Sequence, residues 1–531
     1  RNVPVGQYAV EARSIAFLPA EEIIELREGQ ARLVVFQLTR LVINIREATI
    51  SAKKDMYKER NVSSVHRLSS TTIDRIPSFM AKPDLAEYLQ VVPGVVSTGD
   101  RGGQLYFRGG TPVQNLTLLD GMTVINPFHS IGFVSVFDTD LLQTVDVYTS
   151  GFGASYGGRV SSVMDIKTRT GNRNNYAGKA SVSTFGYGIL LEGPIRKMTK
   201  EDPSSTSIIV SQKRSFIDAT QTLLAPYLDS IGIPFSYNDL FGKYTFRNNE
   251  GDQFDLSAFH FRDRANYTGV MQTNWQNTGA RAKYVYSPRF SSSLWSSQLA
   301  YSDYRGDLQE EDFQPRKTHY SSFDVHMVNS HTSEIFDWKA GFGFTTFATS
   351  HEYLNLDSLM VRDDLYTMDA DLFFDSKIRL KRWLIEPGLH LRLYSNYFNF
   401  FLEPRIRVKY TLTESVSLNL SGGLYSQELL STMADEDVIK VFQGFKIGVS
   451  NVENLFFGEW ESIRIQRAWH FASGIHWLPN EYFRMSTEVY IKDFTRLLNY
   501  NRYKIYPDKS AFSMNEQYYR KDYIFERGWA Y

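Results

Sequence analysis

The chain has 531 residues, a formal net charge of -1 and no cysteine. Its length predicts roughly two to four folding units, or one very large all-β body. The near-neutral charge gives no basic face for nucleic acid, and the lack of cysteine excludes disulfides, thiolate metal sites and a cysteine nucleophile.

Aromatic residues make up 15% of the sequence, although 22% of its residues are charged. No window contains 18 consecutive apolar residues, which excludes a transmembrane helix. A membrane β-barrel stays open, because its strands alternate lipid-facing with lumen-facing residues and never look hydrophobic in a sliding window. Aromatic girdles at the two interfaces of such barrels fit this composition.

The N-terminal segment contains three short strand-like runs, QYAVEAR, EIIEL and ARLVVFQLTRLVINI. These are too few for a barrel and too many for a linker, so they predict the closing strands of a small β-sandwich. The charged and poorly patterned run SAKKDMYKERNVSS, at 51–64, predicts a flexible tether.

Residues 65–172 show a mixed pattern. The run KPDLAEYLQVVPGV predicts a short helix that ends before Pro93 and Gly94, and NLTLLDG and TVDVYTS predict strands. Two glycine-marked loops, QLYFRGGTP and GFGASYGGR, indicate a backbone held in turns or approached closely by a ligand or another chain. We therefore predict a compact α+β unit here.

From residue 173 onward, apolar and polar residues alternate strictly in runs such as FDLSAF, RIRVKY, VSLNLS and FRMSTEVYIK, which predicts strands with one polar face. Tight turns at NNEG, SPRF, HTSE, LTES and LPNE alternate with longer polar connections. Short turns at one end and long loops at the other are typical of an up-and-down outer-membrane barrel. The alternative is a soluble antiparallel sandwich or propeller.

The middle of the chain resembles the plug domain of TonB-dependent outer-membrane receptors. The family pattern of L..VPGV, RG, LLDG, a V.V strand and G..A.YG.R...V..I.T is present in order between Leu89 and Thr168. The residues singled out within this pattern are Arg108, Gly109, Gly110, Asp120, Gly121, Tyr156, Gly157 and Arg159. The resemblance implies a mostly β protein, in which an α+β plug fills a large antiparallel transmembrane β-barrel of about 22 strands.

The first segment is similar to the end of a carboxypeptidase-regulatory-like β-sandwich, which precedes the plug in many such receptors from Bacteroidetes and implies no peptidase activity. Its last run leads into a segment similar to the TonB box of that group, formed by Arg46, Glu47, Ala48, Thr49, Ile50, Ser51 and Ala52. A short extended segment beside a tether suits β-augmentation by a partner. The alternative is that this segment is simply the final strand of the sandwich.

The resemblance also implies contacts that hold the plug in the barrel. Arg108 and Arg159 are the candidate latch residues, and Glu386 and Glu403, each in an EP pair at an expected strand start, are the candidate partners. Such pairs would lie in a confined lumen, where breaking one costs several kcal/mol, roughly 3–5. The alternative is that each arginine faces lumen water.

No pattern for catalysis stands out. The sequence has no HExxH motif, and GFGASYGG lacks the Gly-Lys-Ser/Thr ending of a P-loop. No serine has the context of a nucleophile elbow. We therefore expect neither an enzyme nor a metal site or cofactor.

We expect four parts, namely the sandwich end at 1–50, the tether at 51–64, the plug at 65–172 and the barrel at 173–531. About fifteen strand candidates follow residue 172, so we expect further barrel strands beyond this sequence and more of the sandwich before it.

The resemblance implies a receptor that imports a large nutrient, such as a glycan, a peptide or a metal chelate, with energy delivered by TonB. The plug and N-terminal domain would face the periplasm, outer-membrane lipids would surround the barrel, and a surface lipoprotein or a larger complex could join it. The competing hypotheses are a plugged-barrel scaffold in a surface-assembly or secretion complex, and a soluble carbohydrate-binding β protein.

Overall fold

The architecture was obtained as a computed structural model. It describes residues 6–12, 20–27, 34, 36, 64–76, 78, 83–97, 104–129, 132, 134–183, 186–197, 204–216, 235–267, 271–288, 292–310, 315–354, 360–395, 399–431, 445–447, 452–454, 465–480, 483, 485–500 and 523–531. The chain divides into two compact units, Arg1–Arg60 and Asn61–Tyr531.

The first unit contains a two-stranded antiparallel sheet of β1 (Gly6–Ala12) and β2 (Ala20–Leu26). These strands coincide with the predicted runs QYAVEAR and EIIEL. Most of the third predicted run, the tether up to residue 63 and the TonB-box segment at 46–52 lie outside the described residues, so the sandwich remains a prediction.

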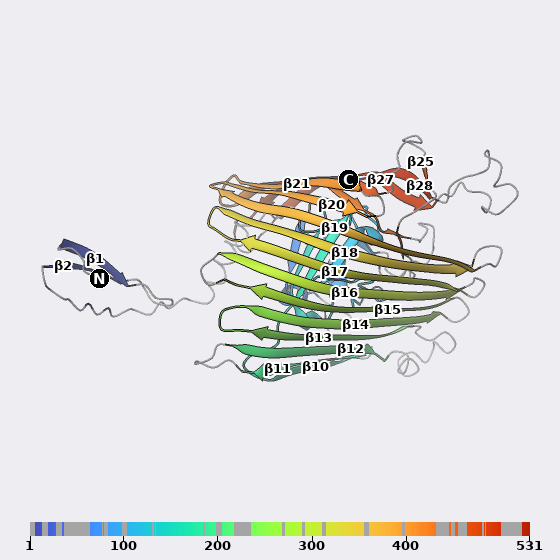
Figure 1. Ribbon diagram of the computed structural model, residues 1–531, viewed down its shortest axis with the longest axis horizontal. Helices are drawn as coiled ribbons and strands as arrows, with labels where there is room; N and C mark the ends of the chain where they lie inside the picture. The colour runs from blue at the N-terminus through green and yellow to red at the C-terminus, as the bar shows by residue number, and fades with distance from the viewer. Residues whose placement is uncertain are drawn as a thin grey trace. The chain divides into compact units, whose positions relative to one another are not determined.

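The second unit is built on a 17-stranded sheet, called here the barrel sheet (Figure 1). Its antiparallel strands, in order, are β10 (Ala177–Val182), β11 (Gly186–Arg196), β12 (Ser205–Ser215), β13 (Phe235–Arg247), β14 (Gln253–Tyr267), β15 (Met271–Tyr286), β16 (Ser293–Glu310), β17 (Arg316–His331), β18 (Phe336–Leu354), β19 (Met360–Leu380), β20 (Trp383–Tyr394), β21 (Asn399–Thr411), β22 (Val416–Gln427), β26 (Gln466–Trp477), β27 (Met485–Tyr500) and β28 (Tyr523–Ala530). The last member, β25 (Val452–Asn454), pairs parallel with β28.

The predicted tight turns separate consecutive strands of this sheet. NNEG joins β13 to β14, and LTES joins β21 to β22. In NNEG, Gly251 has φ +98°, a backbone conformation that glycine adopts at little cost. Within the described residues β10 pairs only with β11, and no ladder joins it to β28. The expectation of further barrel strands therefore stays a prediction.

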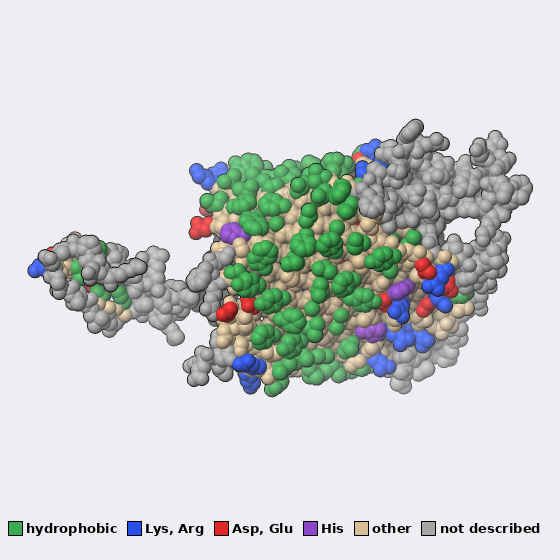
Figure 2. Space-filling model, in the orientation of Figure 1, with side chains coloured by type: hydrophobic (Ala, Val, Ile, Leu, Met, Phe, Trp, Pro, Cys, Tyr) green, Lys and Arg blue, Asp and Glu red, His purple; other side chains and the backbone are tan. Residues whose placement is uncertain are grey.

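The polar face of the barrel sheet points inward. Leu256 is 50% exposed, whereas the neighbouring Ser257 is 1% exposed. The apolar residue is again the exposed one on β21, where Ile406 is exposed and Arg405 is buried. Figure 2 shows hydrophobic side chains spread over the middle of the outer face and charged side chains gathered toward its two ends. An apolar outside with a polar inside is the pattern of a membrane barrel, and it excludes the soluble sandwich or propeller.

The plug, defined here as residues 64–172, lies behind the strands of the barrel sheet that face the viewer in Figure 1. Its five-stranded mixed sheet has the order β3 (Val65–Leu68), β8 (Leu142–Tyr148), β9 (Ser162–Thr168), β6 (Asn115–Leu119) and β7 (Met122–Thr123). A second small sheet pairs β4 (Val95–Ser97) with β5 (Leu105–Phe107). The strands β6 and β8 coincide with the predicted runs NLTLLDG and TVDVYTS.

The plug helices are short: α2 (Ser70–Ile73), α3 (Leu85–Gln90), η2 (Pro112–Gln114) and η3 (Thr139–Leu141). Helix α3 begins at a capping box, in which Asp84 accepts from the backbone N–H of Ala86 and Glu87 reaches back to Asp84. It ends just before Pro93 and Gly94, as the sequence predicts. In the described part of the chain, no helix is long and apolar enough to cross a membrane.

The apolar core of the second unit joins the plug to the inner wall. Val145 and Ile166 of the plug sheet are fully buried, and the same cluster includes Phe241 and Trp275 of the wall. The connection after β22 carries the short strands β23 (Leu430–Ser431) and β24 (Phe445–Lys446). Its Phe445 packs edge-on against Tyr304 of β16, with ring centroids 5.8 Å apart. Part of this long connection therefore returns to the core.

Candidate functional site

The candidate functional site is the interface between the plug and the inner wall of the barrel sheet. Every second residue of a strand points inward, and these positions are largely polar. Because buried polar groups need hydrogen-bond partners, the plug loops and the wall have to satisfy one another. Contacts reach from Glu192 on β11 to Glu488 on β27, so many wall strands hold the plug.

The loop at 107–110 contains two glycines that permit close packing. Gly109 has φ +77°, and a Cβ placed on it would lie 2.4 Å from the Cβ of Ala530 in β28. A Cβ on Gly110 would lie 1.8 Å from the Oγ of Ser161. Both separations are too short for any side chain, so this loop needs glycine at both positions.

Arg108, between these contacts, reaches from the plug to the wall. Its Nη1 donates to Glu488 Oε1 at 2.7 Å and to Ser64 Oγ at 2.9 Å. Its guanidinium lies 4.5 Å from the ring centroid of Tyr490. Arg108 is 4% exposed and Glu488 is 17% exposed, so solvent screens this ion pair little.

Strand β27 also holds the beginning of the plug. The backbone N–H of Ser64 donates to Glu488 Oε2 at 3.0 Å, and the Ser64 hydroxyl donates to the same carboxylate. Four residues further along β27, Lys492 Nζ donates to the carbonyl oxygens of Phe107 and Ser161 at 3.1 and 3.0 Å. The first residue of the plug and its first glycine loop are thus fixed to one wall strand.

Asp120, in the LLDG motif, forms a second charged contact with the wall. Its carboxylate accepts from the backbone N–H of Thr168 at 2.9 Å and from Lys243 Nζ of β13 at 3.1 Å. Arg281 of β15 donates to the Asp120 carbonyl oxygen. Burial disfavours the charged carboxylate, but Lys243 and Arg281 outweigh it and hold the pKa of Asp120 below its ordinary value.

Wall side chains also rest directly on glycine backbone in the plug motifs. A Cβ on Gly121, whose φ is +88°, would lie 2.5 Å from Gln298 Nε2. A Cβ on Gly157 would lie 2.6 Å from His390 Nε2. The glycines of the sequence motifs therefore mark places where the wall approaches the plug backbone.

The loop at 151–159 is held through its backbone by two wall strands. The carboxylate of Asp375, on β19, accepts from the N–H groups of Ala154 and Ser155 at 2.8 and 2.7 Å. His390, on β20, donates through Nδ1 to the carbonyl oxygen of Ala154 at 2.8 Å. The wall therefore satisfies both backbone donors and a backbone acceptor of this loop.

Arg405 on β21, the strand next to β20, also holds this loop. It donates to the carbonyl oxygens of Gly153 and Tyr156. Tyr156 in turn donates its hydroxyl to Asp165 of the plug sheet at 2.8 Å. The motif tyrosine thus links the loop to the plug sheet, while its backbone contacts the wall.

The carboxylates expected to receive the plug arginines pair within the wall instead. Glu386 lies 3.0 Å from Arg407, its register partner on β21, and Glu403 lies 2.6 Å from Arg405, two residues along the same strand. Neither glutamate begins its strand, since β20 and β21 start several residues earlier. Each of these glutamates is therefore neutralised by an arginine of the wall. Arg108 of the plug pairs with Glu488 instead.

Arg159 is buried without a carboxylate partner among the described residues. Its Nη1 donates to the Gly158 carbonyl oxygen at 2.8 Å. A Cβ on Gly158 would lie 2.9 Å from Nη1 of the wall residue Arg392. Burial, with the nearby Arg392 charge adding to it, lowers the pKa of Arg159 from its ordinary value. The alternative that Arg159 faces lumen water does not fit its 6% exposure.

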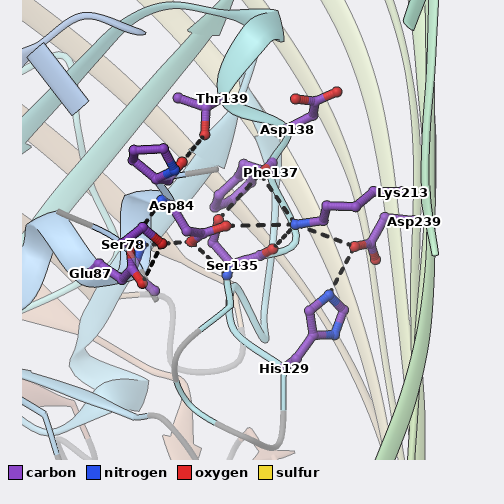
Figure 3. A network of polar contacts seen from close by, with 12 residues as sticks. Ser78, Asp84, Glu87, His129, Ser135, Phe137, Asp138, Thr139, Lys213 and Asp239 are labelled. Atoms are coloured by element: carbon purple, nitrogen blue, oxygen red, sulfur yellow. Dashed lines mark hydrogen bonds and ion pairs between the residues drawn. The ribbon is translucent and has the colours of Figure 1, made fainter. Parts of the chain in front are cut away.

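Sequence reasoning missed a buried charge at His129 (Figure 3). Its Nε2 lies 2.8 Å from Asp239 Oδ2 on β13, and its Nδ1 lies 2.9 Å from Asp263 Oδ2 on β14. The imidazole stacks on Tyr237 with ring centroids 4.2 Å apart. Burial alone would lower the pKa of His129, but the carboxylates of Asp239 and Asp263 outweigh it and raise the pKa to about 9.

The His129 contact continues into a wider network through Lys213 of β12 (Figure 3). Lys213 Nζ lies 3.7 Å from carboxylate oxygens of both Asp84 and Asp239, and it donates to the carbonyl oxygens of Ser135 and Phe137. Asp84 is the residue that caps α3. Strand parity could have placed Asp239 on the inner face, but no sequence spacing links it to a lone histidine far away along the chain.

In the portion of the chain that the structure describes, no group of three His, Asp or Glu side chains is arranged to hold a metal ion. The charged residues bind one another and the plug backbone, and so fix the plug against the wall.

The comparisons with known proteins agree with this architecture. Residues 60–162 match the TonB-dependent Receptor Plug Domain family. A variant of the ferric enterobactin receptor from Pseudomonas aeruginosa aligns with 90% of this chain and 78% of its own, at 14% identity and a TM-score of 0.61. The siderophore receptor PirA from Pseudomonas aeruginosa aligns over 88% and 81%, at 15% identity and a TM-score of 0.58. No curated protein sequence matches the chain significantly.

The plug match and the shared fold define the class of protein. Residues 60–162 carry the plug domain of TonB-dependent receptors, and the chain has the plugged-barrel fold of the solved receptors. The predicted fold class, a mostly β protein with a large barrel filled by an α+β plug, is confirmed.

Proposed function

We propose that the protein is a TonB-dependent receptor that captures a large nutrient at the cell surface and admits it when TonB displaces part of the plug. The observation that carries this proposal is the character of the plug–wall contacts. Arg108, Asp120 and His129 each meet the wall through charged groups. Such contacts hold a domain in one geometry, yet they can be exchanged for water when the domain moves.

The place where force would enter is the beginning of the plug. We assign the TonB box to Arg46–Ala52, and the chain runs from there through the tether to Ser64. Because Ser64 and Arg108 share the carboxylate of Glu488, a pull on the tether would load this contact first. Glu488 therefore becomes the latch partner in this proposal.

The nutrient falls in the class of glycans, peptides or metal chelates. Two of the structures with the same fold are named as receptors for ferric enterobactin or siderophores. At 14–15% identity these structures support the fold but do not choose among the three ligands. Because of the names of these two receptors, a ferric siderophore is the first ligand to test, followed by glycans and peptides.

The test replaces residues 46–52 with a Gly-Ser segment of equal length, and the matched control replaces 53–59 in the same way. We expect uptake to be lost in the first variant and kept in the second, at equal amounts of folded protein in the outer membrane, because only the first removes the strand that TonB adds to its own sheet.

Uptake that survives replacement of 46–52 would overturn the energy-coupling proposal. Purification in mild detergent, with mass spectrometry of everything retained, separates the remaining roles. A bound chelate, glycan or peptide supports transport, whereas stoichiometric recovery with a large assembly machine and no ligand supports the scaffold.

The contact between Arg108 and Glu488 can be tested by single-molecule pulling through residues 46–52. The first rupture should occur at lower force in Arg108→Gln than in the wild type. An unchanged force contradicts the role of Arg108.

A further inference from the structure

The outer face of strands β14 to β19 changes from apolar to charged toward the strand ends opposite the predicted tight turns. At these ends short connections at 268–270, 311–315 and 355–359 join the strands, and on the same side of the sheet long connections join β12 to β13 and β27 to β28. Away from these strand ends, Leu256, Leu299 and Phe344 are 50%, 48% and 44% exposed. Closer to those connections, Figure 2 shows Lys, Arg, Asp, Glu and His side chains gathered on the same face. This charged band lies directly beside the apolar band.

The strand register shows that the charges form two ordered rows, called here the rim rows. The first row runs from strand to strand through Arg262, Gln276, Arg305, His319, Ser350 and Asp364. The second runs through Arg264, Asn274, Asp307, Lys317, Glu352 and Arg362. All of these positions have the outward parity of Leu256, Leu299 and Phe344. With strands about 4.8 Å apart, each row spans roughly 24 Å.

Positive charge is in excess within the rim rows. They carry five Lys or Arg side chains and one histidine against three carboxylates. Some charges are neutralised locally, since Arg362 pairs with Asp364 at 2.7 Å and Arg305 pairs with the buried Asp303 at 3.1 Å. Arg262 and Lys317 form no ion pair with any of the described residues.

The same side chains line an open cavity of about 500 Å³. Its lining includes Arg262, Arg305, Lys317, His319 and Arg362, together with the carboxylates of Asp307 and Glu352. Guanidinium groups bind phosphate through two parallel hydrogen bonds, and lysine adds a compact charge. The cavity therefore offers an anion several donors from neighbouring strands, with exposed apolar side chains next to it.

We propose that the rim rows bind the phosphate group of an anionic membrane lipid, in the leaflet at the long-connection end of the barrel, while its acyl chains lie along the apolar face beside Leu299. The position favours a lipid over a soluble anion, because the charged band directly continues the surface that contacts acyl chains. This inference rests on the membrane barrel and not on nutrient transport, so it stands or fails independently of the proposed function.

The test uses the full chain in nanodiscs of phosphatidylcholine containing a minor fraction of phosphatidic acid. Native mass spectrometry counts the lipids that remain bound after release. We expect phosphatidic acid to be retained preferentially by the wild type, and about tenfold less by Arg262→Gln/Lys317→Gln, because each basic residue near an anionic lipid contributes to binding. Raised ionic strength should weaken retention.

The matched control is Lys381→Gln/Arg382→Gln, which removes the same charge from the exposed turn between β19 and β20 at the opposite strand ends. Its retention of phosphatidic acid should equal that of the wild type. Equal loss in both double variants, or no loss in either, overturns the proposal. So does inorganic phosphate that displaces the lipid completely at low concentration, because the site would then bind the free anion.

Discussion

His129 shows how single residues fix the plug in this protein. It is 1% exposed and lies between two wall carboxylates, Asp239 and Asp263. Leaving any one of these three groups charged and unpaired in a buried site would be costly. The protonated imidazole therefore joins the plug to two neighbouring strands at once, and its charge state controls the strength of that contact.

The pKa of His129 predicts a loss of stability at alkaline pH. Its pKa in the folded protein, about 9, lies above the ordinary value of 6.5. The contribution is therefore fully present below pH 6.5 and is lost as the pH rises through 9. The shift corresponds to about 3 kcal/mol. Thermal unfolding followed across this range should show a fall in melting temperature for the wild type.

The control for this effect is His129→Gln, which cannot titrate. Its stability should be lower than that of the wild type below pH 6.5, where two carboxylates lose their charged partner. Its melting temperature should, however, change less between the two ends of the pH range. A wild type and a variant with the same pH dependence would show that another group titrates.

At the scale of elements, the glycine loops of the plug are shaped by the wall and by one another. We predict that Gly110→Ala destabilises the plug by roughly 1–3 kcal/mol, the usual cost of forcing atoms into a packed site. The added Cβ would lie 1.8 Å from Ser161 Oγ, and Ser161 also holds Lys492. Limited proteolysis of the folded protein should release plug fragments faster in this variant.

The matched control is Gly242→Ala in β13, where an added Cβ meets nothing within 4 Å. This substitution should leave both the melting temperature and the proteolysis rate near those of the wild type. Equal sensitivity of the two variants would mean that the 107–110 loop can relax away from Ser161, and the close packing would then not be needed.

At the scale of the whole molecule, the apolar outer face is what keeps the barrel in a bilayer. We predict that Leu299→Arg, near the middle of β16, costs about 2–4 kcal/mol in membrane insertion, the range found for Arg or Lys at the bilayer midplane. The heat-modifiable band of folded barrel on a gel should become weaker. Leu299→Phe keeps the surface apolar and should behave like the wild type; an equally weak band for both would indicate a packing effect.

The sequence predicts much of this architecture. The period-2 runs identify which residues of a strand share a face, and the turn residues identify where strands end, because both depend on neighbours within a few positions. The motif glycines Gly109, Gly110 and Gly121 likewise predict that other atoms pack closely against the plug backbone, although the sequence does not say which atoms these are. The tether up to residue 63 and the proposed TonB box at 46–52 remain predictions, since they lie outside the described residues.

The sequence by itself determined the alternation, the turns and the order of the plug motifs, all of which are local properties of the chain. Only the tertiary structure decided which groups meet. Arg108 pairs with Glu488, 380 positions away, while Glu386 and Glu403 pair within the wall. Parity places a side chain on a face but does not select its partner on another element. That choice depends on how the plug is seated against the registered strands, which sets the distances between charges.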